Sequence, residues 1–178
     1  MPRVGFRVCP PFSYDAYNCG VVIITSSSDD KLRKAKGLGA DYLINYRTTP
    51  EWQDKVMEFT GGDGADIILE CGGAKTLRKS LDAVAFGGLI ACIGYVSGKE
   101  DAPEDRTNIN LLALRRNVTL KGIINGPRDR FEEVCAFYAK HQIHPQVDRA
   151  FDFGQAKEAL GYLFSGAHVG KVVVRVDS

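Results

Sequence analysis

The sequence predicts a doubly wound α/β fold with a parallel sheet, because short apolar runs alternate with helical segments along most of the chain. Residues 21–25 form an unbroken, largely β-branched run, which is typical of a strand buried on both faces. Glycine occurs 19 times, often in pairs beside the apolar runs, as in loops that join strands to helices. Strand–helix–strand units of this kind build a parallel sheet through right-handed crossovers.

The helices are predicted from their caps and their apolar spacing. Ser27 or Ser28 can cap a helix that runs to about Gly37, where glycine ends it. Pro50 suits the first position of the next helix, which stops at residues 61–62. Leu77 and Leu81 fall on the inward side of a third helix.

The remaining elements follow in order. We expect strands at 42–44, 65–70, 89–93 and 118–124, helices at 74–86, 111–115 and 127–141, a polar loop at 97–108, and a closing strand, helix and strand at 147–153, 155–164 and 169–176.

Residues 1–20 do not fit this pattern. Residues 3–8 could form a strand, but Arg3 and Arg7 would be costly in the central, doubly buried position of such a sheet. Pro10 and Pro11 then break the chain, and too few residues remain for a helix with its loops. We therefore expect that residues 1–20 do not replace a first strand–helix unit. The segment is a candidate for disorder.

Composition and charge exclude several classes of protein. The 23 Lys and Arg residues balance 22 Asp and Glu residues, which leaves no electrostatic footprint for nucleic acid or an anionic membrane. No apolar run approaches the length of a membrane span, and the start of the chain lacks the apolar core of a signal peptide. Five cysteines without a C-x-x-C pair indicate free thiols in a reducing compartment, so we expect a cytoplasmic protein.

A glycine-rich phosphate loop is missing from the expected place. Such a loop follows the first strand as G-x-G-x-x-G and opens a helix that holds a pyrophosphate. Gly37-x-Gly39 and Gly62-x-Gly64 lack the third glycine, and both follow a helix and precede a strand. Neither can serve as this loop.

The chain from residue 21 to residue 176 carries motifs that identify a family by resemblance. They read VIITSSSDDKLRKAKGLGAD at 22–41, INYR at 44–47, FTGGDGADIILECGG at 59–73, FGGLIACIG at 86–94 and GAHVGKVVVRV at 166–176. In this order and spacing they resemble the C-terminal, cofactor-binding half of medium-chain dehydrogenases/reductases, and among these the zinc-type alcohol dehydrogenase-like and quinone oxidoreductase-like proteins.

The resemblance implies a fold and a domain organisation. The fold is a Rossmann-like sheet truncated at its first strand–helix unit, followed by a strand–helix–strand tail from the family's catalytic domain. The domains are then an atypical segment at 1–20, a partial cofactor domain at 21–145 and the tail at 146–178.

The same resemblance implies NADP(H) rather than NAD(H) as the cofactor. Ser26, between Thr25 and Ser27, matches the position where NAD-preferring relatives carry an acidic residue for the ribose 2′-hydroxyl. A hydroxyl can donate to a 2′-phosphate, whereas a carboxylate would repel it. Lys31 and Tyr46 match residues at the adenosine end. The alternative is that the serines only cap a helix and that Lys31 is a solvated side chain.

Other matched positions lie at the expected nicotinamide and ribose side. They are Cys71, Gly72, Gly73, Ile93, Gly94, Tyr95 and Ile123. Lys171 matches a family lysine that lies near the cofactor. The alternative is that the glycines simply end strands and that Lys171 lies on the surface. For Cys71 itself, and for Cys92, a buried thiol is the simplest interpretation.

Catalytic and metal chemistry are poorly supported in this chain. His141 and His144 are close in sequence without a third ligand nearby, so we expect no zinc here. No catalytic acid or base can be named, because the family's relay would lie largely in the missing half. The chain alone is expected to bind the dinucleotide more weakly than about 100 μM and to turn over little or not at all.

Three functional interpretations remain open. The first is an oxidoreductase that transfers hydride between nicotinamide and an alcohol, carbonyl, quinone or enone. The second is a non-catalytic remnant that acts through a partner or through homo-oligomers joined at the edge strand 118–124. The third, another Rossmann-like binder such as a methyltransferase, does not explain residues 25–31 or the closing GKVVVRV.

Overall fold

The structure is a computed structural model that describes residues 4–8, 20–103 and 108–176. The chain divides into two compact units, residues 1–124 and 125–178. The predicted domain limits, which concern the family's division into cofactor and catalytic domains, stay a prediction.

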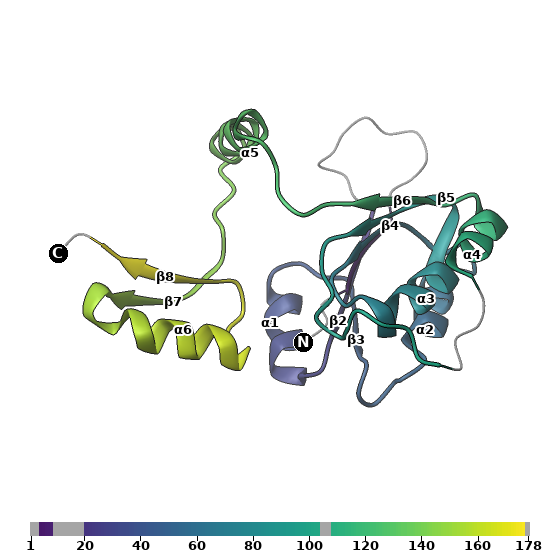
Figure 1. The fold of residues 1–178 in the computed structure, drawn as a ribbon, viewed down its shortest axis with the longest axis horizontal. Helices are drawn as coiled ribbons and strands as arrows, with labels where there is room; N and C mark the ends of the chain where they lie inside the picture. The colour runs from purple at the N-terminus through teal and green to yellow at the C-terminus, as the bar shows by residue number, and fades with distance from the viewer. Residues whose placement is uncertain (1–3, 9–19, 104–107, 177–178) are drawn as a thin grey trace. The chain divides into compact units, whose positions relative to one another are not determined.

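The first unit is an α/β sheet domain. Its elements are β1 (Val4–Val8), β2 (Val21–Ser26), α1 (Asp29–Gly37), β3 (Tyr42–Asn45), α2 (Trp52–Phe59), β4 (Ala65–Glu70), α3 (Ala74–Ala83), β5 (Val84–Cys92), α4 (Ile109–Arg116) and β6 (Thr119–Gly122). The strand order is β3-β2-β1-β4-β5-β6. Helix α1 covers one face of the sheet, and α2, α3 and α4 lie on the other (Figure 1). This arrangement confirms the predicted doubly wound fold.

Strand β1 occupies the central position of the sheet, between β2 and β4. It runs antiparallel to both neighbours, with Phe6 opposite Ile23 on one side and Ile68 on the other. Residues 1–20 were expected not to replace the first strand–helix unit of the sheet. For the strand of that unit, this expectation is wrong, because β1 takes the central position. Residues 9–19 lie outside the described part of the chain, so the expected disorder and the lost helix stay untested there.

The short connection between β1 and β2 favours the antiparallel direction of β1. Only residues 9–20 separate β1 from β2. A parallel neighbour would need a crossover that usually includes a helix, whereas an antiparallel neighbour needs only a turn. Without β1, the backbone groups along the facing sides of β2 and β4 would lack strand partners, which is unfavourable in a buried sheet. Of the two arginines, Arg7 belongs to β1, and Arg3 lies outside the described residues.

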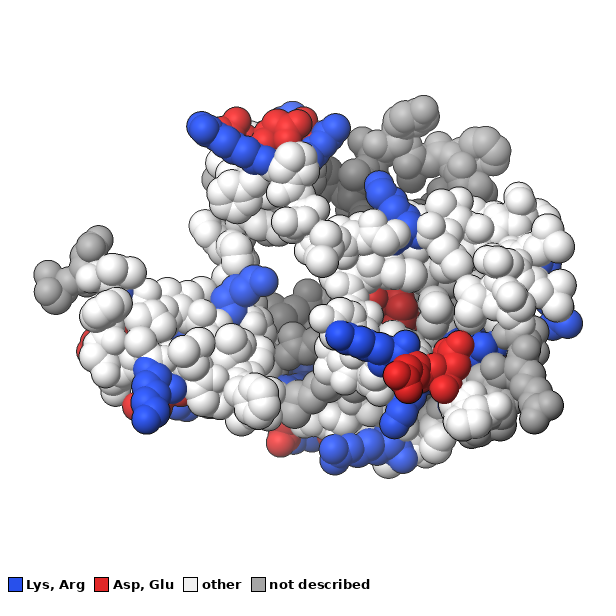
Figure 2. Space-filling view, viewed as in Figure 1, with Lys and Arg blue, Asp and Glu red and all other residues white. Residues whose placement is uncertain are grey.

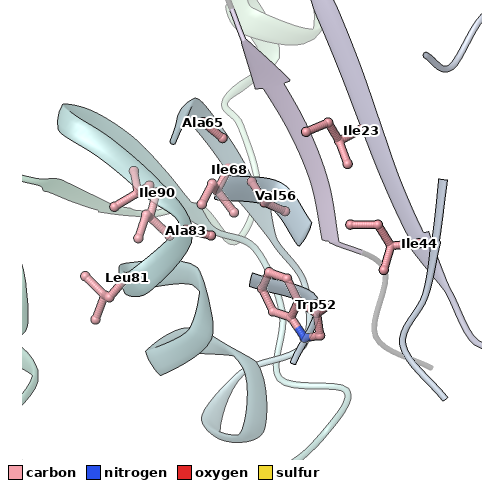
Figure 3. Close-up of a cluster of buried hydrophobic side chains, with 10 residues drawn as sticks. Ile23, Ile44, Trp52, Val56, Ala65, Ile68, Leu81, Ala83 and Ile90 are labelled. Carbon is pink, nitrogen blue, oxygen red and sulfur yellow. The ribbon is translucent and has the colours of Figure 1, made fainter. Parts of the chain in front are cut away.

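The core lies between the sheet and the helices α2 and α3 (Figure 3). Isoleucines from four strands meet Trp52 and Val56 of α2 and Leu81 of α3. The strand residues are Ile23, Ile44, Ile68 and Ile90, each at most 3% exposed. The predicted inward position of Leu81 on α3 is confirmed, and Trp52 and Val56 form the buried side of α2.

The predicted end of the third helix is wrong. Helix α3 ends at Ala83 rather than at residue 86, because the chain turns at once into β5. Val84 pairs with Ala65 of β4, and the register shifts before Ile67 pairs with Leu89. The pair Gly87–Gly88 therefore lies inside the irregular strand.

Helix α2 begins at Trp52 with Glu51 as its N-cap, so Pro50 precedes the helix instead of opening it. Helix α1 is capped as predicted by Ser28, whose hydroxyl accepts from the Lys31 amide at 3.5 Å.

The second unit contains α5 (Arg128–Lys140), β7 (Val147–Asp152), the short 3₁₀ helix η1 (Phe153–Gln155), α6 (Ala156–Ser165) and β8 (Lys171–Arg175). Strands β7 and β8 pair in parallel, with α6 between them in the chain. Asp148 holds this unit together, since its carboxylate accepts from the Tyr162 hydroxyl at 2.7 Å and from the Val169 amide at 3.1 Å. The predicted strand–helix–strand arrangement is confirmed, and its origin in a catalytic domain stays a prediction.

Candidate functional site

The parallel strands of the first unit end together at one edge of the sheet. Strands β2, β3, β4, β5 and β6 end there at Ser26, Asn45, Glu70, Cys92 and Gly122. In open α/β sheets, ligands bind beyond this carboxyl edge, where the chain order reverses. Here the reversal lies between β2 and β4, on either side of β1.

A cleft of about 270 Å³ opens at this edge, between the end of β2 and the start of α3. Its lining residues are Thr25, Tyr46, Pro50, Trp52, Lys75, Thr76, Lys79 and Ser97. Thr25 and Tyr46 were predicted from the sequence, and the structure brings them together here. The lining offers hydroxyls, two aromatic rings and two ammonium groups, a set that suits an anionic ligand with a flat ring.

The other six lining residues were missed by the sequence analysis. Lys75 and Lys79 stand one helical turn apart, directly after the Gly72–Gly73 pair, and this spacing was the signal available for them. Ser97 was missed because it lies in a loop, and no local pattern predicts that this loop packs against α3. Its hydroxyl accepts from the Lys75 amide at 3.2 Å.

Of the two cleft lysines, Lys79 is already paired. Its ammonium donates to the Pro50 carbonyl at 2.7 Å and lies 3.1 Å from the Glu51 carboxylate. A hydrogen bond from Gln53, followed by the contact with Lys79, lowers the pKa of Glu51 below its ordinary value. Lys75 is exposed, and it makes no ion pair with another described residue. Lys75 is thus the cleft's available cation.

Ser26 ends β2, Ser27 and Ser28 follow it, and the three serines differ in their contacts. Ser26 is buried; its hydroxyl accepts from the Ser28 amide at 3.3 Å, and its carbonyl accepts from the Tyr46 amide at 3.1 Å. Ser27 and Lys31 are half-buried beside it, and Ser28 is the helix cap. The alternative of a helix cap therefore holds for Ser28 and leaves Ser26, Ser27 and Lys31 as candidates.

The turn Cys71–Gly73 packs tightly against residues 94–98. The Gly72 carbonyl accepts from the Ser97 amide at 2.7 Å, and the Cys71 carbonyl accepts from the Val96 amide at 3.2 Å. A Cβ atom on Gly94 would lie 2.7 Å from the Cys71 carbonyl oxygen. Gly73 has φ +92°, and a Cβ there would lie 2.7 Å from the Gly98 carbonyl oxygen. These predicted residues are neighbours, and glycine is required at both positions.

Ile93, Tyr95 and Ile123 lie at the same edge, beyond β5 and β6. Their exposed fractions are 44%, 62% and 41%, which is high for apolar side chains. Backbone hydrogen bonds fix two of them, from the Ile93 amide to the Glu70 carbonyl at 2.8 Å and from the Ile123 amide to the Cys92 carbonyl at 2.9 Å. Their contact with a nicotinamide ring stays a prediction.

Lys171 begins β8 in the second unit, and its amide donates to the Gln146 carbonyl at 2.8 Å. Lys171 belongs to the second unit, and its place near a cofactor also stays a prediction.

A larger cleft, of about 420 Å³, lies among α1, β3 and α2. Its lining includes Leu32, Arg33, Asn45, Lys55 and Phe59, and none of the residues predicted for the cofactor site. The smaller cleft is the better candidate because it lies beside the strand ends on both sides of the order reversal.

A metal site and a membrane-spanning helix each have requirements, and the described residues meet neither set. Among them, no three His, Cys, Asp or Glu side chains gather so that they could hold a metal ion. None of the described helices has the length and apolar character needed to cross a membrane. On the face shown in Figure 2, basic and acidic side chains are interspersed among uncharged ones.

Comparison with known proteins identifies relatives over most of the chain. The family model described as zinc-binding dehydrogenase matches residues 14–140. A zinc-type alcohol dehydrogenase-like protein of Schizosaccharomyces pombe is 42% identical over 156 residues, which are 88% of this chain and 45% of that protein. A 2-haloacrylate reductase of a Burkholderia species is 30% identical over 158 residues, which are 86% of this chain and 47% of that protein.

Solved structures agree with these relatives. The crystal structure of an NAD-dependent alcohol dehydrogenase superposes with a TM-score of 0.73 at 31% identity, over 87% of this chain and 43% of that one. The chain thus spans about half the length of the curated relatives and of the solved chains that it matches.

Proposed function

The chain belongs to the zinc-binding dehydrogenase family, within the medium-chain dehydrogenases/reductases that the sequence resembles, and from this premise we propose that it is an NADP(H)-binding oxidoreductase unit. The proposed reaction is hydride transfer between a nicotinamide and an alcohol, carbonyl, quinone or enone. The cofactor supplies the hydride chemistry, and the protein binds and orients it. The relatives include proteins described as alcohol dehydrogenases, quinone oxidoreductases and a haloacrylate reductase.

The observation that carries the proposal is the cleft at the carboxyl edge. Thr25 and Tyr46 from the β2–β3 side face Lys75, Thr76 and Ser97 from the β4–β5 side. A dinucleotide of this kind binds across the same order reversal in doubly wound sheets. The cleft would take the adenosine end, and the turn at Gly72–Gly73 would let the cofactor backbone approach closely.

The preference for NADP(H) rests on the residues after β2. Ser26 stands where an acidic side chain would bind a free ribose 2′-hydroxyl, and Lys31 and Lys75 offer positive charge to a 2′-phosphate. One relative is described as NAD-dependent, so the choice between the cofactors depends on these side chains and not on the family.

The structure gives a physical reason to expect weak binding by the chain alone. Because β1 is antiparallel, its carboxyl end lies at the opposite edge of the sheet from the cleft. It cannot place a phosphate loop beside the candidate site. Since no catalytic acid or base is identified in this chain, we also propose that the isolated chain turns over little or not at all.

The proposal is tested by calorimetric titration of the chain with NADPH and with NADH. We expect NADPH to bind measurably, with a Kd above about 100 μM, and NADH to bind several-fold more weakly. Ser26→Asp should reverse the order, since its carboxylate repels a 2′-phosphate and accepts from a 2′-hydroxyl. Equal binding of both cofactors before and after the substitution would contradict the assigned preference.

A second candidate function is favoured by the open edge of the sheet. Strand β6 is the last strand and pairs only with β5 among the described strands, and Ile124 just beyond it is 96% exposed. A non-catalytic chain that acts by self-association through this edge would use these groups. A folded chain that binds neither cofactor and forms stable dimers would support this function instead.

A further inference from the structure

Glu70 is a buried acid that the site described above does not use. It is the last residue of β4 and only 1% exposed. Its side chain lies on the face of the sheet that α3 covers, directly behind the turn Cys71–Gly73. A buried carboxylate is unfavourable unless hydrogen bonds replace the lost water.

Four donors surround this carboxylate. Oε1 accepts from the Gly72 amide at 2.6 Å, from the Gly73 amide at 3.1 Å and from the Thr76 hydroxyl at 2.6 Å. Oε2 accepts from the Ser80 hydroxyl. The positive end of the α3 dipole lies beside it, since Gly73 is the N-cap of α3. Glu70 therefore joins the end of β4, the turn and the first two turns of α3.

The same turn carries the loop that borders the cleft. The Gly72 carbonyl accepts from both the amide and the hydroxyl of Ser97, at 2.7 and 2.8 Å. Thr76 and Ser97 both line the cleft. The position of these two lining residues thus depends on a turn whose two glycine amides Glu70 holds.

We propose that Glu70 is a positioning residue of the dinucleotide site. Its carboxylate fixes the Gly72 and Gly73 amides, and through them it keeps Thr76 and Ser97 in the places from which they meet the cofactor. It lies behind the turn and does not touch the cofactor. This inference rests on the proposed function, because it assigns Glu70 to the site that binds NADP(H).

Three variants separate this role from a general contribution to stability. Glu70→Leu replaces the carboxylate with an apolar side chain and removes both acceptor oxygens, and Glu70→Gln restores one acceptor oxygen. Ser80→Ala is the matched control, because it removes a hydrogen bond of Glu70 without touching the turn. The single tryptophan, Trp52, lines the cleft, so energy transfer from Trp52 to bound NADPH reports the Kd of each variant.

We expect Glu70→Leu to raise the Kd for NADPH at least tenfold, while Glu70→Gln and Ser80→Ala stay within threefold of the wild type. Hydrogen exchange measured by NMR should show slow exchange of the Gly72 and Gly73 amides in the wild type and in Ser80→Ala. Exchange of both amides should be at least tenfold faster in Glu70→Leu.

The outcomes distinguish this inference from the proposed function. NADPH binding that is equal in the wild type and Glu70→Leu, or an equal loss in Glu70→Leu and Ser80→Ala, would overturn the positioning role alone. If Glu70→Leu does not fold, the test rests on the wild type. Fast hydrogen exchange of its Gly72 and Gly73 amides would then overturn the positioning role. A wild type that does not bind NADPH would instead contradict the proposed function.

Discussion

Lys75 lines the cleft at a position that favours an anionic ligand beside it. It lies in the first turn of α3, near the positive end of the helix dipole, and that turn contains no acidic residue of its own. A cation at this position costs a helix about 0.3–1 kcal/mol. An anionic group in the cleft would interact favourably with both the ammonium and the dipole.

Substitution of this lysine should therefore separate binding from stability. We expect Lys75→Glu to weaken NADPH binding about tenfold, which is about 1.4 kcal/mol. The thermal midpoint should stay the same or rise slightly, because a carboxylate in the first turn favours the helix. Titration calorimetry and thermal unfolding measure the two effects.

Lys140→Glu, at the exposed end of α5, makes the same change of charge away from the cleft and serves as the control. Equal weakening by both variants would show a general effect of charge and would remove Lys75 from the site.

Cys92 provides a prediction that depends on pH. Burial, and then the charge of Glu70, raise the pKa of this thiol above its ordinary value of 9.0. Cys92 should therefore be alkylated by iodoacetamide at pH 8 much more slowly than the exposed Cys135, as peptide mass spectrometry would measure. Faster labelling of Cys92 than of Cys135 in the folded chain would contradict this assignment.

The same shift has a consequence for stability. Above pH 9.0 the unfolded chain loses the Cys92 proton while the folded chain keeps it. Because the folded state then binds more protons, the contribution of Cys92 to stability is present below that pH and is lost as the pH rises through the folded pKa.

At the scale of elements, β1 pairs with a strand on each side, β2 and β4. Phe6 has a strand partner on each side, Ile23 and Ile68. Phe6→Pro removes one backbone donor from the centre of the sheet, and an unsatisfied buried partner costs about 1–3 kcal/mol. We expect a lower urea midpoint for this variant, measured by circular dichroism.

Glu100→Pro, in the exposed loop after β5, is the control for proline itself. If Phe6→Pro unfolds at the same urea concentration as Glu100→Pro, β1 does not contribute its pairing to the folded chain.

Most elements could be predicted from local pattern, and the exceptions have identifiable causes. Strand β2, helix α1 and its Ser28 cap follow from an apolar run and a hydroxyl just before a helix. Strand β1 could not be placed, because its position depends on pairing between β2 and β4 that no local pattern reveals. The early start of β5 at Val84 depends in the same way on its partner Ala65.

The candidate site was predictable only where a motif marked it. Thr25 and Tyr46 stand in motifs beside strand ends, so sequence reasoning found them. Lys75 and Ser97 reach the cleft through the packing of α3 against the loop after β5. From the sequence, Glu70 was identified only as the end of a strand. Its carboxylate accepts hydrogen bonds from the turn that follows it, and such local contacts produce no characteristic residue spacing.

At the scale of the whole molecule, the open edge of the sheet predicts association. Ile123 and Ile124 are 41% and 96% exposed beside the edge strand β6. Exposed apolar groups next to an unpaired strand favour edge-to-edge pairing. We expect the chain to form dimers in multi-angle light scattering and Ile124→Asp to weaken them at least tenfold.

Phe164→Asp, which changes a 95% exposed side chain of the second unit, is the comparison for that variant. A monomer at every concentration, or an equal loss of dimers in both variants, would contradict association through β6.

The central claim is that the cleft at the carboxyl edge of the sheet binds the dinucleotide. NMR of the ¹⁵N-labelled chain during titration with NADPH tests it most directly, because each backbone amide reports its own surroundings. We predict the largest shifts at Thr25, Tyr46, Lys75 and Ser97, with saturation above about 100 μM. Shifts confined to the larger cleft around Arg33 and Lys55, or none at millimolar NADPH, would contradict the claim.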